Sequence, residues 1–140
     1  MATVRASFVP IQQPTRQAPD AFAAASVTLG SAQTGNVSTT NTADRVTPGG
    51  GGQVVLTSTV GATPTVKVDI QGSIDGTNFY NIPYALVATP STFVVAQITV
   101  TSAVTTVYLL QPDQAWRYLK LVYSSNTNVT LTAVATLARP

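Results

Sequence analysis

The chain contains no histidine, no cysteine and no glutamate among its 140 residues. Without histidine there is no imidazole to act as a general base near neutral pH or to bind a metal. Without cysteine there is no thiol nucleophile, no thiolate ligand for zinc and no disulfide framework. Because these absences remove most of the common catalytic constellations, we expect a protein that is not an enzyme.

The acidic residues are all aspartates: Asp20, Asp44, Asp69, Asp75 and Asp113. A glycosidase needs two carboxylates on either side of a sugar, and Asp69 and Asp75 are the only aspartates close in sequence. We expect Asp69 on the polar face of a strand and Asp75 in a glycine turn, where aspartate is a common residue. The stretch from Asp75 to Asn78 could offer oxygens to Ca²⁺, but it has fewer ligands than an EF-hand loop. We therefore predict no catalytic pair, no metal and no cofactor.

Charged residues are scarce, at 9% of the chain, and the net charge is only +2. The seven basic residues are scattered, whereas a nucleic-acid-binding protein has a clustered basic face. No run approaches the about 18 apolar residues of a membrane-spanning helix, and the first residues lack the apolar core of a signal peptide. We expect neither nucleic acid nor membrane as a partner, and synthesis in a cytoplasm.

Threonine and valine dominate what is present, with 23 and 19 residues. β-Branched side chains suit a pleated, half-buried surface, so the composition favours strands. Residues 66–71 alternate strictly, with Val66, Val68 and Ile70 on one face and polar residues on the other. A turn at 73–78 follows, and a second strand at 78–82 pairs back on the first. This hairpin needs more sheet to cover its apolar face.

The rest of the chain supplies short segments with strand-like patterns. These are residues 53–60, 93–101, 105–110, 115–123 and 129–137, separated by turn-like stretches at 61–64, 89–91, 111–113 and 124–128. One apolar face is predicted for each strand, in this order: Val54 and Leu56; Val94, Ala96, Ile98 and Val100; Val107 and Leu109; Leu119, Leu121 and Tyr123; and Val129, Leu131, Ala133 and Ala135. Residues 21–30 also favour a strand, 31–47 a polar loop, and Gly49–Gly52 a flexible loop or linker. The spacing predicts an all-β fold, an antiparallel β-sandwich or barrel of about seven to eight short strands. We place this domain at 21–140, with its core at 53–138.

Residues 1–20 are predicted to form an extended N-terminal arm, because prolines recur there. Fully stretched, such an arm reaches roughly 65 Å. It is either a loose terminus or a segment that docks on a neighbour. A loose terminus is the general expectation for such a segment, but Phe8, Val9 and Ile11 are apolar residues that a purely solvated tail would not need, so both alternatives stay open. The candidate interface residues are Phe8, Val9, Ile11, Arg16 and Trp116.

Trp116 begins a stretch in which aromatic and basic residues interleave, WRYLKLVY. Such a strand could stack nucleic-acid bases. Tryptophan and tyrosine are also ordinary sandwich residues, large and amphipathic. Because the chain has no basic run elsewhere, a core or interface position is the favoured interpretation.

Two segments carry a resemblance to a known family. IQGSIDGTNFYNI (70–82) resembles the "QGSxDGxNW/F" turn of small β-sandwich proteins of tailed bacteriophages. WRYLKLVYSSNTNVTLTAVATL (116–137) is similar to their "RYLRL…S…VTVT" closing hairpin. The match covers roughly residues 53–138, and its motifs are more specific for the fold than for function. The family includes head decoration (cement) proteins and tail or fibre modules.

The resemblance implies a virion structural protein, most like a head decoration protein. Such a protein would lie on the capsid surface, bind the major capsid protein, associate with itself as a trimer and bridge capsid subunits. An arm before the sandwich also looks like a cement protein. The alternative that the family offers is a tail or fibre accessory module that binds host-surface glycan, with Trp116 or Tyr84 as the stacking platform.

Overall fold

The computed structural model describes residues 24–37, 40–45 and 49–138. The described residues form eight antiparallel strands that belong to one hydrogen-bonded sheet, so the all-β prediction is confirmed. They contain no helix of the length and apolarity that crossing a bilayer requires. The strands are β1 (Ala24–Thr34), β2 (Ala43–Asp44), β3 (Gly52–Ser73), β4 (Tyr80–Asn81), β5 (Tyr84–Leu86), β6 (Ile98–Val100), β7 (Thr105–Leu110) and β8 (Tyr118–Ala138).

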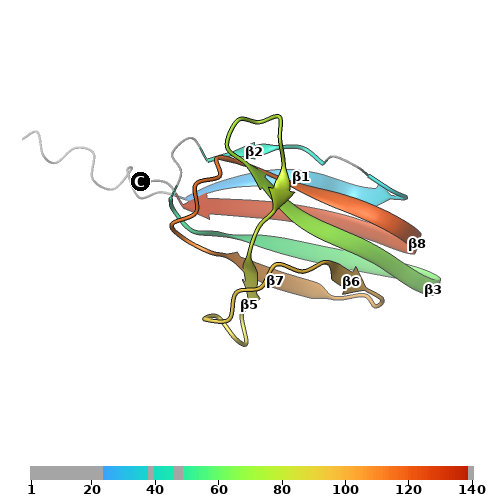
Figure 1. Cartoon of the computed structure of the whole chain (residues 1–140). Coiled ribbons are helices and arrows are strands. Elements are labelled where there is room, and N and C mark those ends of the chain that lie inside the picture. Colours follow the sequence, from blue (N-terminus) through green and yellow to red (C-terminus); the bar gives the residue numbers. More distant parts are fainter. Residues whose placement is uncertain (1–23, 38–39, 46–48, 139–140) are drawn as a thin grey trace, which may run out of the picture.

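Two long strands, β3 and β8, form the spine of the molecule. They pair antiparallel from Gly52 opposite Leu137 to Ser73 opposite Tyr118, with the register shifted between Val60 and Lys67. Both strands fold back at this shift, at the right-hand end of Figure 1. The sheet thereby doubles over into two facing layers.

The bend shows that one prediction from the sequence is wrong. Residues 61–64 and 124–128 were expected to be turns that separate short strands, but they lie inside β3 and β8. Positive φ angles at Thr63, Ser125 and Asn128 reverse the direction of the chain there. The two bends lie side by side in the β3–β8 ladder, so pairing resumes directly beyond them.

Layer one contains β1, the second half of β8, the first half of β3, β7 and β5, in that order. Layer two contains the first half of β8 and the second half of β3. Strand β2 pairs with this part of β8, and β4 and β6 pair with this part of β3. The predicted hairpin is confirmed, because Gln71 pairs with Asn81 and Gly72 with Tyr80.

The core fills the space between the layers and forms one cluster of apolar side chains. Layer one contributes mainly Val54, Leu56, Tyr108, Leu110, Leu131, Ala133, Ala135 and Leu137; layer two contributes mainly Val66, Val68, Ile70, Ile98, Val100, Leu119, Leu121 and Tyr123. The inward faces predicted for 66–70, 119–123 and 129–135 are therefore confirmed. Burial of this apolar surface is the main stabilising contribution to such a fold.

The face predicted for β7 is wrong, and the face predicted for 93–101 is confirmed only at Ile98 and Val100, which are buried. In β7 the buried residues are Tyr108 and Leu110, not Val107 and Leu109. All four are apolar, so alternation could not select a face, and the larger aromatic side chain is the one inside. The strand predicted at 93–101 is reduced to β6, and Val94 is 44% exposed.

The glycines at 49–52 are held by neighbouring segments. Gly49 accepts a hydrogen bond from the backbone N–H of Asp113, and Gly51 accepts one from Ala138. A Cβ at position 52 would lie 2.8 Å from the carbonyl oxygen of Thr136. The flexible loop expected here is thus a close approach between chain segments, which explains the need for glycine.

Candidate functional site

Four of the five candidate interface residues, Phe8, Val9, Ile11 and Arg16, lie outside the described residues. Trp116 lies within them, and its side chain is only 1% exposed. The ring packs beneath Arg45, and its Cβ lies 2.9 Å from where a Cβ on Gly72 would stand. In this geometry Trp116 is a core residue, so it offers no ring to a partner surface.

Arg45 is one of the scattered basic residues of the sequence, yet it is fully buried. Its guanidinium carbon lies 3.6 Å from the centroid of the Trp116 ring. Its two terminal nitrogens donate to the carbonyl oxygens of Gly50 and Gln114. Burial lowers the pKa of Arg45 because it disfavours the charged form. The side chain connects the glycine stretch to the loop before β8, which is a structural task.

A partly exposed ion pair lies beside this arginine. Arg117 donates through Nε and Nη2 to the two carboxylate oxygens of Asp44, at 2.7 and 2.9 Å. The hydrogen bond to Asp44 raises the pKa of Arg117. The bidentate geometry fixes β2 against the start of β8, and both side chains keep about 40% of their surface exposed.

The aspartates that might have formed a catalytic or metal site are engaged locally. One oxygen of Asp75 accepts hydrogen bonds from the Ser73 hydroxyl and the backbone N–H groups of Thr77 and Asn78; the other accepts from the Asn78 amide. These bonds, led by that from the Asn78 N–H, hold the pKa of Asp75 well below its usual range. Asp69 accepts from the Gln97 amide. The described residues bring no three potential metal-ligating His, Cys, Asp or Glu side chains together.

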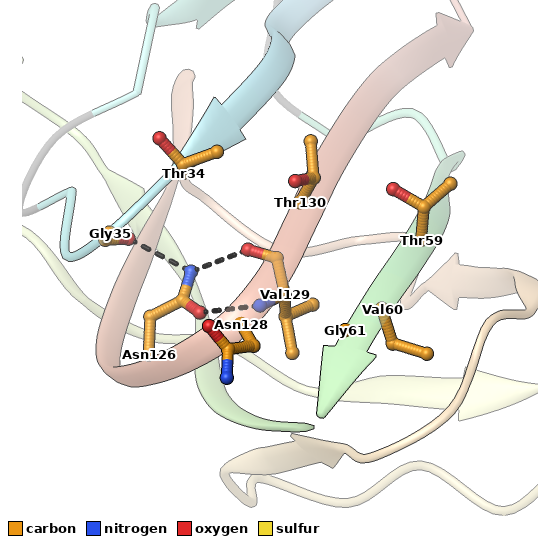
Figure 2. A pocket seen from close by; sticks show the side chains of 9 residues that line it. All are labelled: Thr34, Gly35, Thr59, Val60, Gly61, Asn126, Asn128, Val129 and Thr130. Carbon is orange, nitrogen blue, oxygen red and sulfur yellow. Dashed lines mark hydrogen bonds between the residues drawn. The ribbon is translucent and has the colours of Figure 1, made fainter. Parts of the chain in front are cut away.

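A polar hollow of about 480 Å³ lies over the bend of the sheet, and Figure 2 shows its lining. Thr34, Thr130 and Thr59 form a row across β1, β8 and β3, because each is the register partner of the next. Asn126 lies at its floor and donates from its amide to the carbonyl oxygens of Gly35 and Val129. Its side-chain oxygen accepts from the N–H of Val129. The hollow presents hydroxyl and amide groups without a charge, a chemistry suited to a neutral polar ligand.

An apolar groove of about 410 Å³ lies where the β5–β7 edge of layer one meets β6 of layer two. Its floor is formed by Tyr84, Ile98 and Tyr108, each less than 10% exposed. Leu86 and Val94 line its open side and are 45% and 44% exposed. The sequence analysis did not predict this groove, because its walls are formed by the way the consecutive strands β5, β6 and β7 fold against one another.

The two tyrosines of the groove floor are buried too deeply to act as a stacking surface. Their rings meet edge to face, with centroids 5.4 Å apart. Burial raises the pKa of both Tyr84 and Tyr108. Neither Tyr84 nor Trp116 therefore presents an open ring face of the kind that sugar stacking requires.

Charge is distributed unevenly between the layers. Every charged residue in the described part of the chain lies in layer two or in a connecting segment, and the strands of layer one contain none. On the outer face of layer one, Val55 lies between Val107 of β7 and Val134 of β8 in one row. Threonine pairs flank this row, Thr57 with Thr105 and Thr57 with Thr132. The result is a neutral, β-branched surface beside the polar hollow.

Comparisons with known proteins give one informative likeness. The solved "Crystal structure of SPBc2 prophage-derived protein YomS" shares the fold, with a TM-score of 0.58 over 83% of this chain and 93% of that chain. Sequence identity is 9%, so the likeness is one of fold alone. No protein-family model matches the chain. No curated protein matches it in sequence.

Proposed function

We propose that this protein is a bacteriophage virion protein that decorates the capsid and stabilises it by binding, without catalysis. The phage assignment is supported by the turn and closing-hairpin motifs at 70–82 and 116–137. It is also supported by the fold that the chain shares with the SPBc2 prophage-derived protein YomS. The non-catalytic role is supported by a composition without histidine, cysteine or glutamate.

The observation that carries the capsid-binding part is the neutral outer face of layer one. The centres of protein interfaces are depleted in charged residues, and a flat sheet face can cover a neighbouring subunit without desolvating a charge. Layer two carries the charged residues Lys67, Asp69 and Lys120, which are half-buried on its outer face. Several such contacts around a symmetric assembly would raise the overall avidity.

The test measures co-sedimentation of the purified full-length protein with empty capsids from the same phage. Val55→Asp places a charge in the centre of the neutral face, and Val122→Asp places the same charge on a half-buried outward position of layer two. We expect Val55→Asp to abolish binding and Val122→Asp to preserve it, with circular dichroism confirming that both variants fold. Equal binding by both variants would show that layer one does not contact the capsid. No binding by the unmodified protein would refute the proposal.

The polar hollow favours one alternative, a tail or fibre module that binds a neutral host-surface glycan. Its threonine row and asparagines provide suitable hydrogen-bonding groups. The aromatic platform expected at Trp116 or Tyr84 is buried, which weakens this alternative. A glycan array distinguishes the two functions. Binding that Thr130→Val abolishes, without any binding to capsids, would favour the glycan-binding module.

A further inference from the structure

We propose that the apolar groove between β5, β6 and β7 receives residues 8–11 of a neighbouring copy of the chain. The inference deepens the proposed function, because it names a surface through which copies of the decorating protein would associate, and it rests on that proposed function. Two observations support this inference: the lining of the groove and the sequence of residues 1–20.

The groove has the form of a site left open at the side of the sandwich. β5 is the last strand of layer one and β6 is an edge strand of layer two. The segment between them bridges this side through two backbone hydrogen bonds between Tyr84 and Val94, and the groove lies beside this bridge. Its buried floor of Tyr84, Ile98 and Tyr108 continues into the exposed apolar rim of Leu86 and Val94. An exposed apolar surface of this kind typically marks an interaction site.

The uncharged, apolar lining of the groove indicates which segment of the chain it binds. None of the residues that line it is charged. Residues 6–15 of the chain are also uncharged, and Phe8, Val9 and Ile11 cluster at their centre. Pro10 lacks an N–H, so a segment containing it pairs along at most part of a strand edge and depends on side-chain pockets. Phe8 and Ile11 are the side chains that fit such a pocket.

The chain before β1 is long enough to reach the groove of a neighbouring copy. The described chain begins with β1, which lies at the opposite edge of layer one from β5. Four strand spacings separate these edges, roughly 19 Å. Residues 12–23 contain Pro14 and Pro19, and a proline-rich spacer of this length spans about 37 Å. This length reaches either the chain's own groove or that of the next molecule, and we assign it to the next molecule because the proposed virion protein acts as an assembly of copies. Such a head-to-tail contact can close into a ring.

The first experiment measures binding of a labelled peptide with the sequence of residues 1–20 by fluorescence anisotropy. The receiving protein is the full-length double variant Phe8→Asp/Ile11→Asp, whose groove is free of its own arms. Adding Leu86→Asp to this receiver should weaken peptide binding by about tenfold or more, because the buried charge has no partner. Adding Val87→Asp is the matched control, since Val87 is 58% exposed and does not line the groove. Equal loss with both changes, or no peptide binding, overturns the proposal.

The second experiment uses complementation and measures mass by light scattering. The unmodified chain should be an oligomer, whereas Phe8→Asp/Ile11→Asp alone and Leu86→Asp alone should each be monomeric. Mixing these two variants should give a heterodimer, because one provides an intact groove and the other an intact arm. An arm that docks on its own molecule would leave all samples monomeric, which overturns the proposal.

Capsid co-sedimentation separates this inference from the proposed function. If the protein associates through the groove but does not bind capsids, the groove contact is supported and capsid decoration is refuted. If the protein binds capsids as a monomer, capsid decoration is supported and the groove contact is refuted.

Discussion

Gly76 shows how one residue sets the shape of the hairpin between β3 and β4. Its φ is +81°, a conformation that side chains with a Cβ rarely adopt. A Cβ there would also lie 3.2 Å from Cε2 of Tyr118. The N–H of Gly76 donates to the Ser73 hydroxyl, which in turn donates to Asp75. Backbone conformation and side-chain hydrogen bonds therefore specify the same turn.

Substitution of Gly76 should be costly for this reason. We expect Gly76→Val to lower the free energy of unfolding by about 1 kcal/mol or more, because valine is strained at positive φ. Thermal or urea unfolding measures the change. Thr77→Val is the control, since its backbone N–H can still donate to Asp75. An unchanged midpoint for Gly76→Val would contradict the role of this turn.

Tyr123 is a buried residue whose polar atom is not satisfied. Its side chain is 1% exposed, and its hydroxyl has no hydrogen-bond partner among the described residues. We expect Tyr123→Phe to stabilise the fold by about 1 kcal/mol, because the cost of desolvating the hydroxyl is removed. Chemical unfolding at pH 7 checks the sign, and a destabilised variant would show that the hydroxyl has a stabilising contact.

The same residue predicts a dependence on alkaline pH. Burial raises the pKa of Tyr123 to about 12, whereas the pKa of a tyrosine in the unfolded chain is about 10. The unfolded state therefore loses its proton first, and this contribution to stability is present below about pH 10 and lost as the pH rises through 12. The melting temperature of the unmodified protein should fall more steeply over this interval than that of Tyr123→Phe. Parallel curves would contradict the assignment.

At the scale of the element, β8 combines a clear alternation with a bend. Leu121 is fully buried, while Lys120 points outward with its ammonium 4.3 Å from the centroid of the Phe79 ring. We expect Leu121→Ala to cost about 2–5 kcal/mol, as for other buried leucines. Lys120→Ala should cost less than about 1 kcal/mol, because an exposed cation–π contact is weak. Denaturant unfolding measures the free energy of unfolding of both variants. A larger loss for Lys120→Ala than for Leu121→Ala would show that the buried and exposed faces of β8 are assigned the wrong way round.

The turn from Ser73 to Asn78 should fold without a metal ion. Both oxygens of Asp75 accept hydrogen bonds from groups of the turn itself. We therefore expect EDTA to leave the melting temperature unchanged. A clear drop on chelation that Ca²⁺ restores, and that Asp75→Asn abolishes, would show that the turn binds calcium.

At the scale of the whole molecule, the arm and the sandwich should be separable. The described core is formed entirely by residues from Leu29 onward. Deleting residues 2–20 should leave circular dichroism and melting temperature near those of the full chain. The proposed self-association and capsid binding should weaken strongly, since residues 8–11 are proposed to supply apolar anchors to a partner. Unfolding of the truncated protein would place the arm in its own core, and unchanged assembly and capsid binding would show that the arm is dispensable.

Local pattern was enough to predict much of this fold. The alternation at 66–70, 119–123 and 129–137 identified the inward faces, because a strand's side chains alternate whatever packs against them. Asp75 and Gly76 identified the turn through their own backbone preferences. The absence of histidine, cysteine and glutamate narrowed the possible chemistry through composition alone.

Tertiary structure decided what local pattern could not. In β7 both faces are apolar, so only the packing between the layers placed Tyr108 inside. The bends at 61–64 and 124–128 look like ordinary turns in sequence, and only the ladder between them makes β3 and β8 continuous. The burial of Arg45 and the neutral face of layer one depend on strands far apart in the chain. The apolar groove depends on how the consecutive strands β5, β6 and β7 fold onto the two layers. Sequence determined the strands because their signals are local, and the structure determined the surfaces because those arise from contacts between distant residues.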